Sequence, residues 1–178
     1  MFDELDERGN PTGNIVSREE AHKTGKWHRA VAMFLYNHKK DVLLQKRSMQ
    51  KKNWAGRWDV TSGHVDAGES SLESAVREFE EELGIKLTPE EITFIGSSQT
   101  TDTEGDMDNR HFNEYFVTQK DIDLDSVTVQ LGEVDAVEWI EFQKLKQLVI
   151  NRDPKLTEKW QAFDALIEHM ENPKGKEQ

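Results

Sequence analysis

Residues 63–85 read GHVDAGESSLESAVREFEEELGI, and this stretch decides the fold. Ser70 followed three residues later by Glu73 has the capping-box spacing that starts a helix, in which each side chain bonds the backbone N–H of the other residue. Gly84 stands where a helix often ends in a left-handed turn. The pattern therefore predicts an amphipathic helix over 70–83 between two loops.

The predicted helix carries a group of neighbouring carboxylates. On a helical wheel one arc is apolar and is formed by Leu72, Ala75, Val76, Phe79 and Leu83. The adjacent arc holds Glu78, Glu81 and Glu82, whose like charges cost about 0.2–0.5 kcal/mol per pair in an isolated helix. Converging carboxylates suit a hard cation such as Mg²⁺ or Mn²⁺, which prefers oxygen ligands. The alternative is a solvated acidic face.

Outside this stretch the chain alternates predicted strands and helices. Strand patterns occur at 28–36, 41–47, 58–62, 91–99, 112–118 and 134–140. Residues 2–16 read as a hairpin, and 41–47 is expected to pair with 28–36. Asp153 as N-cap and Pro154 at the first helical position predict a last helix. This order predicts the α/β (α+β) class, with a mixed sheet covered by helices on two faces.

The composition excludes several classes of protein. The 178 residues carry 35 acidic and 23 basic side chains, a net charge of -12 that would repel a nucleic-acid polymer. No apolar run reaches the roughly 18 residues of a membrane span, and the first ten residues lack the pattern of a signal peptide. We therefore expect a cytoplasmic protein with neither a nucleic-acid polymer nor a membrane as partner. Cysteine is absent, which removes thiol nucleophiles and disulfides.

The full spacing of residues 63–85 resembles the signature of the Nudix hydrolase family. That signature is Gly-x5-Glu-x7-Arg-Glu-U-x-Glu-Glu-x-Gly-U, where U is bulky and aliphatic, and this chain matches it if Phe79 is allowed at the first U. The resemblance implies a Nudix-like α/β/α sandwich with a loop-helix-loop, the Nudix box, at 63–85. We expect one domain over 1–178, with a core over about 27–157. The hairpin region 1–26 and the helix 153–170 would pack on this core.

The resemblance also implies a reaction and the residues that serve it. The Gly63 carbonyl, Glu78, Glu81 and Glu82 would bind Mg²⁺ or Mn²⁺, Arg77 would orient a catalytic carboxylate, and Glu69 would brace the loop. The implied reaction is hydrolysis of a small-molecule phosphoanhydride, typically a nucleoside diphosphate derivative. The catalytic base is left open between Glu78, Glu81 and a carboxylate from a later segment. The resemblance also allows a homodimer.

A longer resemblance places the chain near one branch of this fold, type I isopentenyl-diphosphate isomerase. The matching segments are Pro11-Thr12-Gly13, Ala21-His22, Trp27-His28, Lys51 to Trp58, Gly63-His64 and Glu114. In the isomerases the basic residues at the positions of Arg47 and Lys51 grip the substrate diphosphate. These two residues are therefore the expected substrate-binding groups, because cations form charge-assisted hydrogen bonds with phosphate oxygens. The alternative is that both are ordinary surface charges.

Two differences from the isomerases favour hydrolysis. Their catalytic cysteine is replaced by Ser62, whose hydroxyl is a poor acid or base, and this chain keeps Glu78 and Glu81, which the isomerases lack. An isomerase acting on isoprenoid diphosphates is therefore the weaker alternative. A non-catalytic nucleotide-binding module of the same fold is another.

The isomerase resemblance raises the question of a second metal site. The isomerases use three His and two Glu, which His22, His28, His64 and Glu114 would match in part, whereas Phe112 occupies the position of the other Glu. We favour the interpretation that these histidines bond structural loops or substrate. A second metal site is the alternative.

Overall fold

The computed structural model describes residues 1–104 and 107–172. The strands are β1 (Phe2–Leu5), β2 (Pro11–Val16), β3 (Trp27–Tyr36), β4 (Asp41–Arg47), β5 (Trp58–Asp59), β6 (Thr61–His64), β7 (Ile92–Glu104), β8 (Met107–Gln119) and β9 (Val134–Glu141). The helices are α1 (Arg18–Thr24), α2 (Ser71–Leu83), α3 (Phe142–Ile150) and α4 (Trp160–Glu171), with short 3-10 turns at Pro89–Glu91 and Leu124–Ser126. No helix within these ranges is long and apolar enough to cross a membrane.

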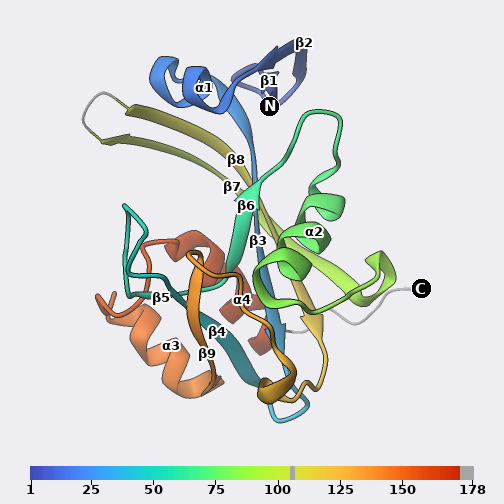
Figure 1. The fold of residues 1–178 in the computed structure, drawn as a ribbon, viewed down its shortest axis with the longest axis vertical. Helices are drawn as coiled ribbons and strands as arrows, with labels where there is room; N and C mark the ends of the chain where they lie inside the picture. Colours follow the sequence, from blue (N-terminus) through green and yellow to red (C-terminus); the bar gives the residue numbers. More distant parts are fainter. Residues whose placement is uncertain (105–106, 173–178) are drawn as a thin grey trace.

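The sheet is mixed, as the sequence predicts, and β3 is its central strand (Figure 1). β3 runs parallel to β8 along its whole length and antiparallel to β6. β7 extends the sheet beyond β8, and the β1–β2 hairpin joins β3 through the pair Leu5↔Trp27. On the other side, β4 pairs with β9 over its length.

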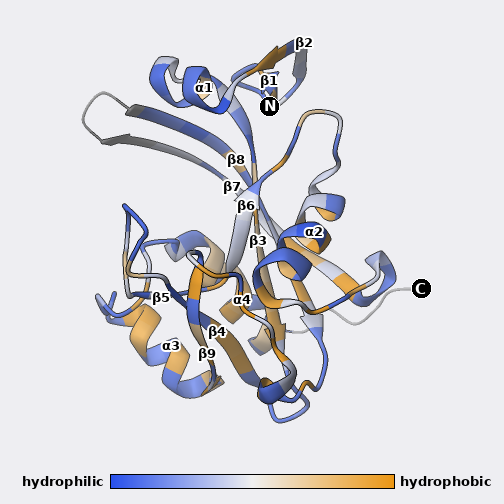
Figure 2. Cartoon of the chain, viewed as in Figure 1, coloured by the Kyte–Doolittle hydropathy of each residue, from blue (hydrophilic) through white to orange (hydrophobic). Residues whose placement is uncertain are grey.

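Apolar side chains fill both faces of the sheet. Because side chains alternate along a strand, Ala32 and Phe34 face one way and Val31 and Met33 the other. The first pair packs in a cluster with residues of α3 and α4, and the second packs against α2. Figure 2 shows apolar residues along the lower parts of β3 and β4 and on α3, whereas α1 is mainly hydrophilic. The expected sandwich of helices on two faces is thus observed.

Several expected elements differ from the structure. The strand 41–47 pairs with β3 only at Tyr36↔Val42 and takes β9 as its main neighbour. The single strand expected at 58–62 is two strands, β5 and β6, and the strands expected at 91–99 and 112–118 extend into the long β7–β8 hairpin. The hairpin in residues 2–16 is confirmed, but α1 and α3 were not predicted.

The last helix begins at Trp160, so the prediction of a helix from Asp153 is wrong. The Asp153 carboxylate accepts a hydrogen bond from the Lys155 N–H, which forms a turn. The residues after Asp153 then pair with the backbone of Trp58 in β5. The Trp58 N–H donates to Lys155 O at 2.7 Å, and the Trp58 carbonyl accepts from Thr157 N at 2.9 Å. Pairing with a distant strand therefore replaces the helix that the local pattern favours.

Candidate functional site

Helix α2 is fixed at both ends by its own residues. The Ser70 hydroxyl accepts from the Glu73 N–H at 3.2 Å, and the Glu73 carboxylate accepts from the Ser70 N–H at 2.8 Å, so the predicted capping box is formed. At the other end Gly84 adopts a left-handed φ of 67°. This fixed frame determines where the glutamates of the helix point.

The carboxylate of Glu78 lies directly against the backbone of Gly63 at the end of β6. A Cβ atom on residue 63 would lie 2.2 Å from the Glu78 carboxyl carbon, so any larger residue would push the Glu78 carboxylate away from this position. The backbone of Gly63 and the carboxylate of Glu78 therefore share one small volume. Both were predicted from the sequence to bind the same cation.

Arg77 connects the loop before α2 with the glutamates on the helix. Its guanidinium donates to both carboxylate oxygens of Glu69 at 3.0 Å and to Glu78 Oε1 at 2.8 Å. It also contacts Glu81 Oε2 at 3.5 Å and the His64 carbonyl at 3.4 Å. The roles expected for Glu69 as a brace and for Arg77 as an orienting group fit these contacts.

Glu82 is a buried carboxylate whose hydrogen-bond partner is a neutral amide. It is 8% exposed, and its hydrogen-bond donor is the amide of Gln45 at 2.7 Å, while the Gln45 oxygen accepts from Thr61. Burial raises the pKa of Glu82 to about 7. Burial also raises the pKa of Glu78, although the neighbouring Arg77 opposes the effect. Two desolvated carboxylates along one helix are a donor set that a divalent cation would stabilise.

The oxygens of Glu78, Glu81 and Glu82 are not gathered into a ready-made cage. In residues 1–104 and 107–172, ligand atoms lying all within 4.8 Å of one another form one group, which contains four histidines. Arg77 holds Glu78, Gln45 holds Glu82, and Glu81 is half exposed. The three glutamates follow one side of α2, so a cation would draw them together through side-chain rotation.

A buried ionic network lies beside Glu82 and was not predicted. Asp59 is fully buried and accepts from Lys159 Nζ at 2.7 Å, Arg47 Nη1 at 3.1 Å and Thr157 Oγ1 at 2.9 Å. Burial acts to raise the pKa of Asp59, but the Lys159 and Arg47 charges outweigh it and hold the pKa below its ordinary value. Lys159 also contacts the hydroxyl of Ser62. Through Thr157 and Lys159, the network ties the segment before α4 to Asp59 on β5, beside Glu82.

The two residues expected to bind substrate are both engaged within the protein. Arg47 donates to Asp59 and, through Nε, to the Asn53 carbonyl at 3.2 Å. Lys51 forms an ion pair with Glu133 and remains partly exposed. Trp54, in the same loop as Lys51, has a left-handed backbone with a φ of 55°. Trp58, at the start of β5, packs against the hydrophobic core.

Four of the six histidines gather on the opposite side of β6 from Glu78. The members of this group, which we call the four-histidine cluster, are His22 on α1, His28 on β3, His64 on β6 and His111 on β8. Glu114 does not belong to it, because it is three residues from His111 on a strand and so points to the other face. The match of Glu114 to this site is therefore corrected to His111, which the sequence pattern did not reveal.

Comparisons with known proteins identify the family to which the chain is similar. A model of the NUDIX domain matches residues 26–161. Nudix hydrolase 3 of Arabidopsis thaliana is 38% identical over 159 residues, which make up 86% of this chain and 21% of that protein. The chain thus spans about a fifth of the length of this relative.

Other similarities cover less of the chain or concern the fold alone. Isopentenyl-diphosphate Delta-isomerase of Pectobacterium atrosepticum is 38% identical over 88 residues, 48% of this chain and 49% of that protein. Among solved structures, the MutT protein of Methanosarcina mazei superposes with a TM-score of 0.63 at 22% identity, covering 82% of this chain and 96% of that one.

Proposed function

Because the chain belongs to the Nudix hydrolase family, we propose that it hydrolyses a phosphoanhydride bond in a nucleoside diphosphate derivative or a related small molecule with the help of Mg²⁺ or Mn²⁺. The observation that carries this proposal is the contact between Gly63 and Glu78 next to the buried Glu82. A backbone oxygen and desolvated carboxylates suit a hard divalent cation.

The residues that would hold the cation are the Gly63 carbonyl, Glu78, Glu81 and Glu82. A divalent cation bound there supplies Lewis-acid polarisation of the diphosphate and lowers the pKa of a bound water molecule. The fit is supported by the raised pKa values of Glu78 and Glu82, because each marks a carboxylate that burial has removed from water. Glu81 is more exposed, and turning toward the same volume would cost it only the long 3.5 Å contact with Arg77.

The chain's own residues would orient the reacting groups. Arg77 holds Glu78 at 2.8 Å from its guanidinium and thereby fixes the carboxylate relative to the Gly63 loop. Glu78 and Glu81 are the candidate bases on α2. The raised pKa of Glu78 favours it as a base, since proton transfer is most efficient when the pKa of the base lies nearer the working pH.

The substrate phosphates would be held by Arg47 and Lys51. Lys51 lies partly exposed beside Glu133 and would exchange this carboxylate for a phosphate oxygen. Arg47 would keep its bond to Asp59 and offer its remaining N–H groups to the diphosphate. A homodimer stays a prediction from the family resemblance.

A substrate panel tests the proposal. Nucleoside di- and triphosphates, nucleotide sugars, dinucleotide cofactors and prenyl diphosphates are incubated with the protein in Mg²⁺ and in EDTA. We expect at least one compound to release phosphate or a monophosphate in Mg²⁺ only. If no compound is cleaved while one binds tightly in EDTA, the protein is a nucleotide-binding module and the proposal is wrong.

The isomerase alternative is opposed by the surroundings of Ser62. This residue occupies the position of the isomerase cysteine, and its hydroxyl contacts Lys159, which is itself bound to Asp59. A hydroxyl ionises far less readily than a thiol, so it is a poor proton donor or acceptor for a carbon centre. Tritium exchange into isopentenyl diphosphate checks this directly, and we expect none.

A further inference from the structure

We propose that Lys159 is a further substrate-binding cation, which donates a hydrogen bond to the diphosphate of the substrate beside Gly63. This inference deepens the proposed function and rests on it. Lys159 directly precedes α4, so it lies far along the chain from the Nudix box and from the loop that contains Arg47 and Lys51. Its place in the site is created by the fold alone.

The ammonium of Lys159 lies next to the backbone that would bind the cation. Its Nζ contacts the hydroxyl of Ser62, which directly precedes Gly63 in β6. Lys159 is also close to Glu82: burial raises the pKa of Glu82, and the positive charge of Lys159 acts against this rise. The residue is therefore near two of the groups that are expected to hold the metal ion, Gly63 and Glu82.

The group around Asp59 holds more positive than negative charge. Asp59 is fully buried and is shared by Lys159 Nζ at 2.7 Å and Arg47 Nη1 at 3.1 Å, so two cations face one carboxylate. Glu82 is near enough to offset the remaining positive charge, but a bound Mg²⁺ would use the charge of Glu82. In the metal-bound protein an anion beside Lys159 would restore the balance, because charges removed from water need partners.

Lys159 has one more donor than it has partners. An ammonium carries three N–H groups and no acceptor. Within residues 1–104 and 107–172, its hydrogen bonds go to Asp59 and Ser62, which leaves one N–H. The Lys159 side chain is 22% exposed and that of Asp59 is 0% exposed, so Lys159 extends from the buried network toward the surface. A phosphate oxygen would accept a charge-assisted hydrogen bond from it.

The backbone and the ammonium of Lys159 are both held in place before a substrate binds. The Lys159 carbonyl accepts from the Ala162 N–H at 3.0 Å in the first turn of α4. Thr157 on the same segment bonds the Asp59 carboxylate through Oγ1 at 2.9 Å. A donor that is already ordered loses little conformational entropy on binding, whereas Lys51 would first have to leave Glu133.

The alternative is that Lys159 only neutralises Asp59. Arg47 already supplies one counter-charge to this carboxylate, so neutrality does not require a second cation. A purely structural Lys159 would affect stability and leave the affinity of the folded protein for phosphates unchanged. This difference separates the two roles by experiment.

Titration of the wild type with inorganic pyrophosphate tests the contact directly. Protein containing lysine labelled with carbon and nitrogen isotopes is saturated with Mg²⁺, and each Nζ is followed by NMR through its Cε atom. Lys159→Arg assigns the Lys159 signal by deleting it. We expect pyrophosphate to shift this signal. An unchanged signal, with the protein saturated or with no pyrophosphate bound, would refute the proposal.

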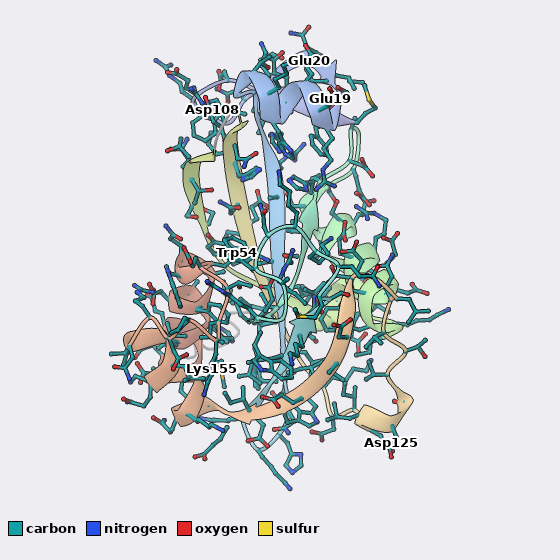
Figure 3. The ribbon with its side chains drawn as sticks, turned by 60° about the vertical axis from the view of Figure 1, so that its left-hand side comes forward. Glu19, Glu20, Trp54, Asp108, Asp125 and Lys155 are labelled. Atoms are coloured by element: carbon teal, nitrogen blue, oxygen red, sulfur yellow. The ribbon has the colours of Figure 1, made fainter. Side chains whose placement is uncertain are left out.

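Variants separate binding from stability. We expect Lys159→Gln to weaken the binding of pyrophosphate in Mg²⁺ by about 10-fold or more, because a hydrogen bond to a charged group contributes a factor of about 10–100. Calorimetry measures the Kd, and circular dichroism checks the fold. Lys159→Arg, which keeps the charge, should restore most of the affinity. Lys155→Gln is the matched control, since Lys155 is exposed and lies on the side of α3 and α4, away from α2 (Figure 3).

Each outcome points to one role. Equal affinities of Lys159→Gln and Lys155→Gln would overturn the proposal and leave Lys159 a structural residue. If Lys159→Gln does not fold, the NMR titration of the wild type decides. Neither measurement requires hydrolysis, so a shifted Lys159 signal in a protein that cleaves no compound of the panel would refute the reaction and leave the contact standing.

Discussion

Glu82 is the proposed metal ligand whose burial most clearly lowers the stability of the metal-free protein. Its pKa is raised from 4.5 in the unfolded chain to about 7 by burial, so the folded state holds the proton more tightly than the unfolded state does. The contribution of Glu82 to stability is therefore greatest below about pH 4.5. It is lost as the pH rises through about 7.

This sign predicts the behaviour of Glu82→Gln without metal. At pH 8 in EDTA the variant should be more stable than the wild type, by at most about 3 kcal/mol, because it removes a buried charge and can still accept from Gln45. At pH 4.5 the difference should vanish. Urea unfolding at the two pH values measures it, with Glu80→Gln as the exposed control; a variant less stable than the wild type at pH 8 would contradict the assignment.

Asp59 is the residue whose loss should damage the fold most directly. Asp59→Asn leaves Lys159 and Arg47 without their shared carboxylate, and breaking one side of a buried ionic pair costs about 3 kcal/mol or more. Chemical denaturation should show a loss of this size. The matched control is Asp164→Asn, which removes an exposed ion pair with Arg152 and should change stability by less than about 1 kcal/mol. Equal effects of the two substitutions would argue against the network.

At this scale the sequence reveals residues whose spacing is local. Glu69, Arg77 and Glu78 lie in one short stretch, and hydrogen bonds join them in the structure. Lys159 reaches Asp59 across 100 positions, and His111 meets His28 from another strand, so neither is marked by a local pattern. The sequence could not supply these contacts because strand register and long side-chain reach decide them.

Helix α2 depends on its capping box for its position beside β6. Ser70→Ala removes the side-chain acceptor of the Glu73 N–H, and we expect a loss of about 1 kcal/mol, typical of an N-cap. Thermal unfolding measures the change. Ser97→Ala on β7 is an exposed control that should alter stability by less than about 0.5 kcal/mol. If the two variants unfold alike, the cap does not stabilise α2.

The limits of some helices follow from local sequence signals, and those of others depend on contacts with distant residues. The limits of α2 follow from Ser70 and Gly84, which act within the helix itself. Helix α1 has a comparable signal, since the Ser17 hydroxyl accepts from Glu20 N, but the helix is only seven residues long. The apolar spacing of Phe142, Leu145 and Val149 would have identified α3. The start of α4 had no such signal, because it depends on pairing with Trp58.

For the whole molecule, the class of fold was accessible from the sequence but the strand order was not. Alternating strands and helices predict a mixed sheet with two covered faces. The parallel pairing of β3 with β8 joins segments about 80 residues apart and has no signature in either strand. This pairing creates the four-histidine cluster on one side of β6, while Gly63 meets α2 on the other. Figure 1 shows β6 between α2 and the end of the sheet that carries α1.

The central claim is that the glutamates of α2 bind the cation that serves hydrolysis. The most direct measurement compares the Mg²⁺-dependent kcat/KM of Glu82→Gln and Glu80→Gln on the substrate that the panel identifies. A metal site contributes several kcal/mol to the transition state, so Glu82→Gln should lose at least about 100-fold. Glu80 lies on the same helix as Glu82 but is exposed and pairs with Lys86, so its replacement should have little effect. Equal activity of the two variants would contradict the account.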